Sequence, residues 1–205
     1  MNSVARCGPT ADHGCVLIVF ARAALGESVA TIHRNDGVVV ELPSYSRKHR
    51  IPHDLAHAVT ERELGLADGV FGSIASGVMF GNMRVVAGRV RHDAAARSSR
   101  ILDANRRALG VAEILAGMLH QVVEGSGPFG AVEAARRGWG SLRQEPFPWT
   151  DEQVLAAAEA LREHGERWVA LGPEDTLEFR WPDRLIAPAP ADDTRHRRSA
   201  RRARK

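Results

Sequence analysis

The sequence predicts an α+β protein in which a small antiparallel sheet packs against four or five helices. Two β-branched runs near the N-terminus flank an Asn-Asp-Gly turn at residues 35–37, a pattern typical of a β-hairpin. An alternating apolar and polar stretch at 176–181 predicts a late strand, and long segments with helical periodicity lie between. We therefore expect a single domain over residues 14–186.

The sheet is expected to begin with residues 15–21 (CVLIVFA), which are rich in β-branched side chains. Residues 28–34 and 38–42 form the two arms of the hairpin, and Pro43 is expected to end the second arm. The late strand at 176–181 is expected to join these N-terminal strands.

The first helix is expected over residues 53–64, which contain no glycine or proline. Pro52 suits the start of a helix, because its missing N–H would have no partner there. Gly65 is a natural stop.

Four later segments show helical signals. They are a short glycine- and serine-rich helix at 70–76, a helix within 93–125 that starts at Asp103 or Asn105, a short helix at 129–139, and a helix at 151–168 behind a Thr150–Gln153 capping box.

Composition and charge restrict the class of protein. The chain has 205 residues, of which 44% are hydrophobic and 26% charged, and this is ordinary for a soluble globular protein. The net charge is +3, but residues 188–205 hold seven basic and two acidic side chains, so this end carries +5 and the rest −2. We expect residues 187–205 to be a disordered basic tail, which either attracts nucleic acid or another polyanion weakly or serves only as a solubilising end.

Localisation is inferred from the cysteines and the apolar runs. The two cysteines, Cys7 and Cys15, give no disulfide framework. The apolar run at 15–21 is much shorter than the roughly 20 residues that cross a bilayer, and no clear export signal precedes it. We expect a cytoplasmic protein without membrane contact.

The hypothesis of a metal site depends on the helix at 53–64, where helical spacing places His53, His57 and Glu61 on one face. Two histidines four residues apart can bind one ion, zinc or another divalent metal, as in the H-E-x-x-H helix of zinc proteases. This chain reads H-D-x-x-H, so the similarity is limited to the histidine spacing. Asp54 or Glu61 would be the catalytic base or a carboxylate that supports the ligands. Alternatively, Asp54 only favours the helix N-terminus and the histidines face water.

A third ligand must come from another element. On the helix within 93–125, Glu113, His120 and Glu124 share one face, opposite an apolar face. If this polar face meets that of the first helix, Glu113 or His120 is the best third ligand. If the two faces meet water instead, these residues are ordinary surface charge.

Two other functions stay open. One is a non-catalytic binding or regulatory protein that contacts nucleic acid or a protein partner through its tail and a loop of interleaved basic and aromatic residues: Arg136, Arg137, Trp139, Arg143, Phe147 and Trp149. Such tryptophans also plug the edge of a core. The other is a domain whose polar helix face meets a protein partner or a second copy.

One segment carries a family resemblance. Leu-Pro-Ser-Tyr at 42–45 is followed by Pro-His-Asp-Leu-x-His at 52–57 and then by Phe71-Gly72. This pattern resembles a family of small uncharacterised bacterial proteins. Because no activity is known for that family, the resemblance implies no mechanism.

Overall fold

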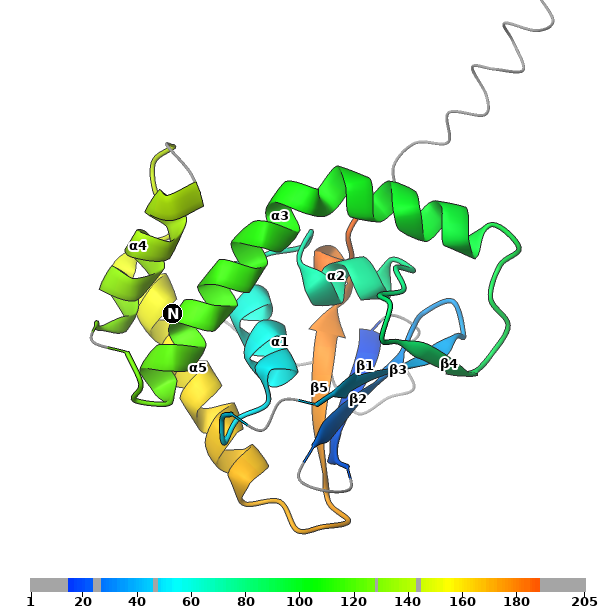
Figure 1. Cartoon of the computed structure of the whole chain (residues 1–205), viewed down its shortest axis with the longest axis horizontal. Coiled ribbons are helices and arrows are strands. Elements are labelled where there is room, and N and C mark those ends of the chain that lie inside the picture. Colours follow the sequence, from blue (N-terminus) through cyan, green and yellow to red (C-terminus); the bar gives the residue numbers. More distant parts are fainter. Residues whose placement is uncertain (1–14, 24–26, 46–47, 128, 143–144, 189–205) are drawn as a thin grey trace, which may run out of the picture.

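Five strands form one antiparallel sheet with the order β4-β3-β2-β1-β5 (Figure 1). The computed structural model describes residues 15–23, 27–45, 48–127, 129–142 and 145–188. The strands are β1 (Cys15–Arg22), β2 (Ser28–His33), β3 (Val39–Ser44), β4 (Arg84–Ala87) and β5 (Thr176–Pro182). Five helices accompany the sheet, so the predicted α+β class is confirmed.

The late strand joins the sheet as predicted, because β5 pairs with β1 and places Phe179 opposite Ile18. Pro43 does not end the second hairpin arm, contrary to the prediction, and lies opposite Val29 within β3. The carbonyl of Pro43 accepts a bond from the side chain of Asn82, on the side away from β2. The missing N–H of the proline therefore costs no bond between β2 and β3.

Strand β4 was not predicted. It is four residues long, all of them exposed, and pairs with β3 through an irregular register at Val39 and Val40. A short exposed edge strand has no buried face, so it leaves no alternation of apolar and polar residues in the sequence.

The helices are α1 (His53–Leu64), α2 (Val70–Ala75), α3 (Ala94–Val123), α4 (Ala131–Leu142) and α5 (Asp151–Val169), and a 3₁₀ turn (Asp183–Leu185) follows β5. Helix α1 begins after Pro52 and ends at Gly65, whose φ of 71° is left-handed, as predicted. Helix α5 begins with the predicted capping box, because Thr150 and Gln153 bond each other's backbone N–H.

The predicted start of α3 is wrong. The helix begins at Ala94, about two and a half turns before Asp103. Asp103 lies within the helix and pairs with Arg106 at i+3, while the buried side chain of Asn105 donates to Ser73 Oγ at 3.1 Å. Asp and Asn are common at helix starts, but here both side chains make contacts from the middle of the helix.

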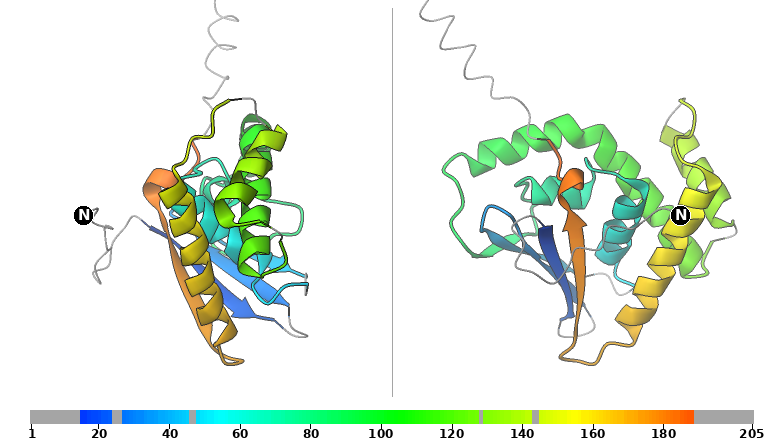
Figure 2. Two further views of the ribbon diagram at one scale, coloured as in Figure 1. Left: turned by 90° about the vertical axis from the view of Figure 1, so that its left-hand side faces the viewer. Right: turned by 180° about the vertical axis from the view of Figure 1, so that it is seen from behind.

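The core fills the space between one face of the sheet and the helices. In β1 the buried side chains are Val16, Ile18 and Phe20, in the alternation expected of a strand. Helix α1 lies between β5 and α5, and the long helix α3 packs against it (Figure 1). Figure 2 shows the same arrangement from behind. Because α1 is enclosed on several sides, its polar residues need partners within the protein.

The described part of the chain begins at Cys15 and ends at Pro188, and the predicted domain bounds of 14 and 186 stay predictions. Ala187 is buried and its N–H donates to the carbonyl of Gly72 at 3.1 Å. The predicted tail from residue 189 onward and the first 14 residues lie outside the described residues. Among the helices that the structure describes, none is long and apolar enough to cross a membrane.

Candidate metal centre

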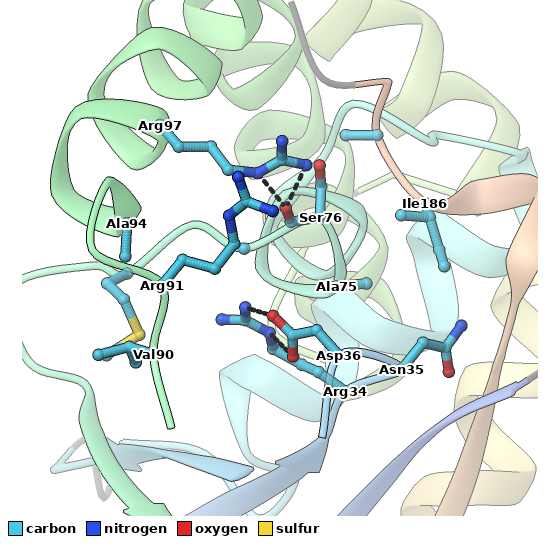
Figure 3. Close-up of a pocket in the computed structure, with 13 residues that line it drawn as sticks. Arg34, Asn35, Asp36, Ala75, Ser76, Val90, Arg91, Ala94, Arg97 and Ile186 are labelled. Atoms are coloured by element: carbon cyan, nitrogen blue, oxygen red, sulfur yellow. Dashed lines mark hydrogen bonds and ion pairs between the residues drawn. The ribbon is translucent and has the colours of Figure 1, made fainter. Parts of the chain in front are cut away.

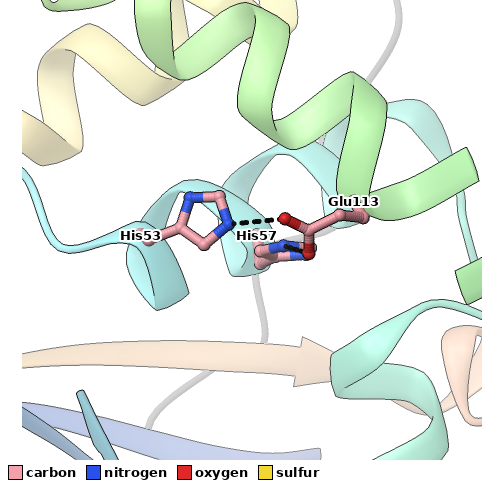
Figure 4. Close-up of side chains that lie close together, drawn as sticks. All are labelled: His53, His57 and Glu113. Carbon is pink, nitrogen blue, oxygen red and sulfur yellow. Dashed lines mark hydrogen bonds and ion pairs between the residues drawn. The ribbon is translucent and has the colours of Figure 1, made fainter. Parts of the chain in front are cut away.

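The polar faces of α1 and α3 meet, and three of the predicted site residues converge there (Figure 4). His53 and His57 come from adjacent turns of α1, and Glu113 comes from the middle of α3. Glu113 Oε1 lies 3.2 Å from His53 Nε2, and Glu113 Oε2 lies 3.0 Å from His57 Nε2. The carboxylate of one helix thus faces both rings of the other.

These distances suit a metal ion. The three ligand atoms all lie within 4.8 Å of one another. Zinc bonds of about 2.0–2.2 Å in tetrahedral geometry place neighbouring ligand atoms about 3.3 Å apart. Two imidazole nitrogens and a carboxylate are a ligand set that zinc and similar divalent metals take in proteins.

Glu61 orients the ring of His57 by contacting the ring nitrogen that faces away from Glu113. His57 Nδ1 lies 2.8 Å from Glu61 Oε1, and both side chains are buried. Glu61 also accepts the N–H groups of Val70 and Phe71 at the start of α2, each at 3.0 Å. A carboxylate on Nδ1 leaves Nε2 as the coordinating atom, which is the usual support of a metal-binding histidine.

His120 does not join the three converging residues. Its Nδ1 lies 3.5 Å from His53 Nδ1, on the side of that ring away from Glu113. Of the two third ligands that the sequence offered, the structure brings Glu113 to the histidines and places His120 behind His53. A neutral His120 can accept a bond from His53 Nδ1–H and so fix that ring, as Glu61 fixes His57.

Charges in the centre are strongly coupled. Burial opposes protonation of His57, but hydrogen bonds and charges from Glu113 and Glu61 outweigh it and raise its pKa to about 10. Hydrogen bonds from His53 and His57 lower the pKa of Glu113 well below its ordinary value. Burial, together with nearby His49 and His53, lowers the pKa of His120 to about 4, so its ring is neutral at physiological pH.

Asp54 lies next to the centre, in the first turn of α1. Burial raises its pKa, although His57, His53 and a hydrogen bond from Ser44 counteract this shift. A raised carboxyl pKa brings the group closer to the range of a general base. Glu61, in contrast, is enclosed by protein donors and has no exposed surface, so of the two predicted catalytic carboxylates only Asp54 has a half-buried position.

The centre is open on one side. The side chains of Glu113 and His53 are 63% and 34% exposed, whereas that of His57 is 3% exposed. A bound ion would therefore have protein beneath it and solvent above it, which leaves room for another ligand.

The interleaved basic and aromatic residues, of which Arg136, Arg137 and Trp139 lie on α4, make mostly internal contacts. Trp149 Nε1 donates to the carbonyl of Leu64 at 2.8 Å, and the ring of Trp149 packs edge-to-face with Trp139. Arg136 pairs with Asp151 and lies over the ring of Phe147. Arg143 lies outside the described residues. These contacts are those of aromatic residues that close the edge of a core.

Two supporting groups were not predicted. The N–H groups of α2 that hold Glu61 belong to an element nine and ten residues further along, and no periodicity in α1 points to them. Glu124, the next candidate for the third ligand after Glu113 and His120, instead accepts the N–H of Ile51 at 2.8 Å and so fixes the start of α1 against α3.

Comparisons with protein-family models, curated proteins and solved structures found no match. The resemblance of residues 42–77 to a bacterial family and the cytoplasmic location therefore stay predictions. Function has to be argued from the geometry of the centre.

Proposed function

We propose that this chain binds a divalent metal ion, zinc or a chemically similar one, through His53, His57 and Glu113, and uses it in hydrolysis. The observation that carries the proposal is the convergence of three ligand atoms within 4.8 Å, with His57 Nδ1 2.8 Å from Glu61 and His53 Nδ1 3.5 Å from His120. Support of both rings from behind is what metal-binding histidines require.

A metal-free function of the same residues is the main alternative. In it, a protonated His57 bridges Glu61 and Glu113 and simply ties α1 to α3. This alternative explains the contacts of His57 but gives no role to His53, whose ring is placed beside the same carboxylate. It also leaves a largely exposed Glu113 as one end of a structural ion pair, an arrangement that contributes little to stability.

The catalytic part of the proposal rests on the open side of the centre. Three protein ligands with a free position are typical of catalytic zinc sites, whereas structural sites have four. A bound divalent metal supplies Lewis acidity and lowers the pKa of water. Asp54 is the candidate base, and Glu61 is a positioning residue because it reaches the centre only through His57.

The experiment is elemental analysis of protein purified without a histidine tag. We expect near-stoichiometric metal in the wild type and in the control His92→Ala, which removes an exposed histidine. His57→Ala and Glu113→Gln should lose the metal. Glu113 is largely exposed, so Glu113→Gln tests the ligand even if removal of the buried His57 disturbs folding.

The proposal is wrong if the wild type contains no metal after incubation with zinc, or if Glu113→Gln retains as much metal as His92→Ala. If metal is present, the wild type and Asp54→Asn are compared on ester, amide and phosphoester substrates. Loss of hydrolysis with retention of metal in Asp54→Asn supports its role as the base, and equal rates would exclude that role.

A further inference from the structure

A second candidate site lies at the other end of α3, in a pocket of about 320 Å³ (Figure 3). Its walls come from the turn between β2 and β3, the end of α2, the start of α3 and the residues after β5. Arg97 and Glu113 are separated by about 24 Å of helix at 1.5 Å per residue, so the pocket is distinct from the metal centre.

The pocket is rich in positive charge. Arg34, Arg91 and Arg97 line it, and the lining carboxylate is that of Asp36. Arg34 pairs with Asp36, and Arg91 forms a two-bond pair with Asp93. Arg97 donates from Nε and Nη2 to the carbonyl of Ser76, at 3.2 and 3.1 Å. Within the described part of the chain, the guanidinium of Arg97 has no carboxylate partner, so its charge is not balanced by its own contacts.

Two of these guanidinium groups approach each other at Gly77. A Cβ atom at Gly77 would lie 3.4 Å from Arg34 Nη2 and 3.5 Å from Arg97 Nε. The side chain of Arg34 is only 7% exposed, so its charge has lost most of its contact with water. The pair with Asp36 balances the charge of Arg34, whereas the neighbouring guanidinium of Arg97 has no carboxylate partner among the described residues. An anion bound here would therefore meet one unbalanced positive charge in a region that solvent screens poorly.

The start of α3 adds to the positive potential. Ala94, the first residue of this 30-residue helix, lines the pocket, and the N-cap residue Asp93 makes no side-chain bond to the first-turn N–H groups. The N–H of Ala94 donates to the carbonyl of Arg91 at 3.1 Å, so this end of the helix favours an anion through its dipole and not through that donor. Figure 3 shows Arg91, Arg97 and the Arg34–Asp36 pair around this hollow.

Besides Asn35 and Ser76, the rest of the wall includes the apolar side chains of Ala75, Met79, Val90 and Ile186. A pocket of this volume, at the lower end of the range for small-molecule sites, has room for more than an inorganic anion. Arginine binds phosphate oxygens through several N–H groups. Asp36 and the carbonyl of Ser76 take the Nε and Nη2 donors of Arg34 and Arg97, so a phosphate would contact their remaining Nη hydrogens. We propose that this pocket binds a small organic phosphate monoester, with the phosphate against Arg34 and Arg97 and the carbon skeleton along the apolar wall.

The test is calorimetric titration of the full-length protein with phenyl phosphate and with inorganic phosphate at constant, near-physiological ionic strength. We expect saturable binding at one site, with phenyl phosphate tighter than phosphate because its ring contacts the apolar wall. Arg97→Gln should weaken binding of phenyl phosphate about tenfold, the effect of one charge-assisted contact. Arg91→Gln, at a largely exposed side chain, should weaken it by less, because it removes positive charge from the wall and no contact with the phosphate.

Two controls separate this site from others. Arg106→Gln removes an exposed arginine of the same helix that does not line the pocket, and Glu113→Gln removes a largely exposed ligand of the metal centre. Both should bind phenyl phosphate as the wild type does. The proposal is overturned if the wild type shows no saturable binding, if phosphate binds and phenyl phosphate does not, if Arg106→Gln weakens binding as much as Arg97→Gln, or if Glu113→Gln abolishes it.

Discussion

At the scale of single residues, the carboxylate of Glu61 connects three parts of the fold. One oxygen contacts His57 Nδ1 and the N–H of Val70, and the other accepts the N–H of Phe71. The space around it is also closed by Gly69, where a Cβ atom would lie 2.5 Å from Glu61 Oε2. A buried carboxylate with three donors is fixed in position, and it fixes the ring of His57 in turn.

Glu61→Gln tests this positioning role. Depending on its orientation, the NH2 group of glutamine would face either the N–H of Phe71 alone or both His57 Nδ1 and the N–H of Val70, so one bond at least is lost. We expect the dissociation constant for zinc to rise about 10–100-fold, the usual effect of a lost supporting bond. Competition with a chromophoric chelator measures it. The control is Glu63→Gln on the same helix, which is exposed and pairs with Arg62, and an equal effect of both variants would contradict the assignment.

The pKa of His57 predicts how metal binding depends on pH. In the metal-free protein this pKa is raised to about 10, so His57 holds a proton at neutral pH. A metal needs the lone pair on Nε2, so binding must release about one proton and affinity must rise up to tenfold per pH unit above neutrality, until the pKa is reached. Calorimetry in two buffers of different protonation enthalpy counts the protons, and identical heats in both would contradict the prediction.

The same shift predicts the stability of the metal-free protein. A histidine whose pKa is higher in the folded state than its ordinary 6.5 stabilises the fold fully below pH 6.5. That contribution is lost as the pH rises toward about 10. Urea unfolding of chelator-treated protein should therefore show a decline of stability across this range that is absent in His57→Gln.

Site residues could be predicted where they are close together in the sequence, and could not where they come from distant segments. Spacing alone placed His53, His57 and Glu61 on one face, because helical periodicity is a local property. It also offered Glu113 and His120 together, and it could not choose between them because the choice depends on how α3 crosses α1. The N–H donors that hold Glu61 come from the tight approach of α2, which depends on the absence of a side chain at Gly69.

At the scale of elements, the packing of α4 on α3 depends on a small residue. A Cβ atom at Gly138 would lie 2.7 Å from Ile114 Cγ2 and 3.2 Å from Met118 Cγ, whereas one at Gly140 would meet no atom within 4 Å. Both glycines lie within α4. The two glycines thus belong to the same helix, but only Gly138 is packed closely against α3.

Gly138→Ala should destabilise the protein by about 1–3 kcal/mol, because the added methyl group forces the two helices apart. Gly140→Ala should stabilise it by about 0.5–1 kcal/mol, because alanine has the higher helix propensity and nothing obstructs it. Chemical denaturation of both variants measures the difference. Destabilisation of equal size at both positions would show that the contact of α4 with α3 is not as described.

Elements were predictable where their signals are local. The strands β1, β2 and β5, the first helix and the capping box of α5 all follow from periodicity and end signals within their own residues. The start of α3 was missed because Asp103 and Asn105 resemble caps while their side chains serve Arg106 and Ser73. Strand β4 was missed because only its pairing with β3 makes it a strand.

At the scale of the whole molecule, charge is divided between two parts of the chain. Residues 188–205 carry +5 and the remainder −2. The last backbone contact of the folded part is that of Ala187 with Gly72, and Leu185 is buried beneath Trp181, whose Nε1 donates to its carbonyl. The described contacts thus extend to Ala187, the first residue of the predicted tail.

Deletion of residues 189–205 should leave the melting temperature and zinc affinity unchanged, since no described contact is removed. It should abolish retention on heparin or nucleic acid at low salt, because such binding depends on the basic residues and weakens steeply with salt. A longer deletion that also removes residues 183–188 should destabilise the fold. Unchanged retention of the 189–205 deletion would show that the tail does not bind polyanions.

The central claim is the location of a divalent metal between α1 and α3. Diffraction at the zinc absorption edge from crystals of the untagged protein with equimolar zinc tests it most directly. We predict one anomalous peak within about 2.0–2.2 Å of His53 Nε2, His57 Nε2 and a carboxylate oxygen of Glu113. Crystals with no peak at this position, or with the ion bound elsewhere and His57 still bonded to Glu113, would contradict the account.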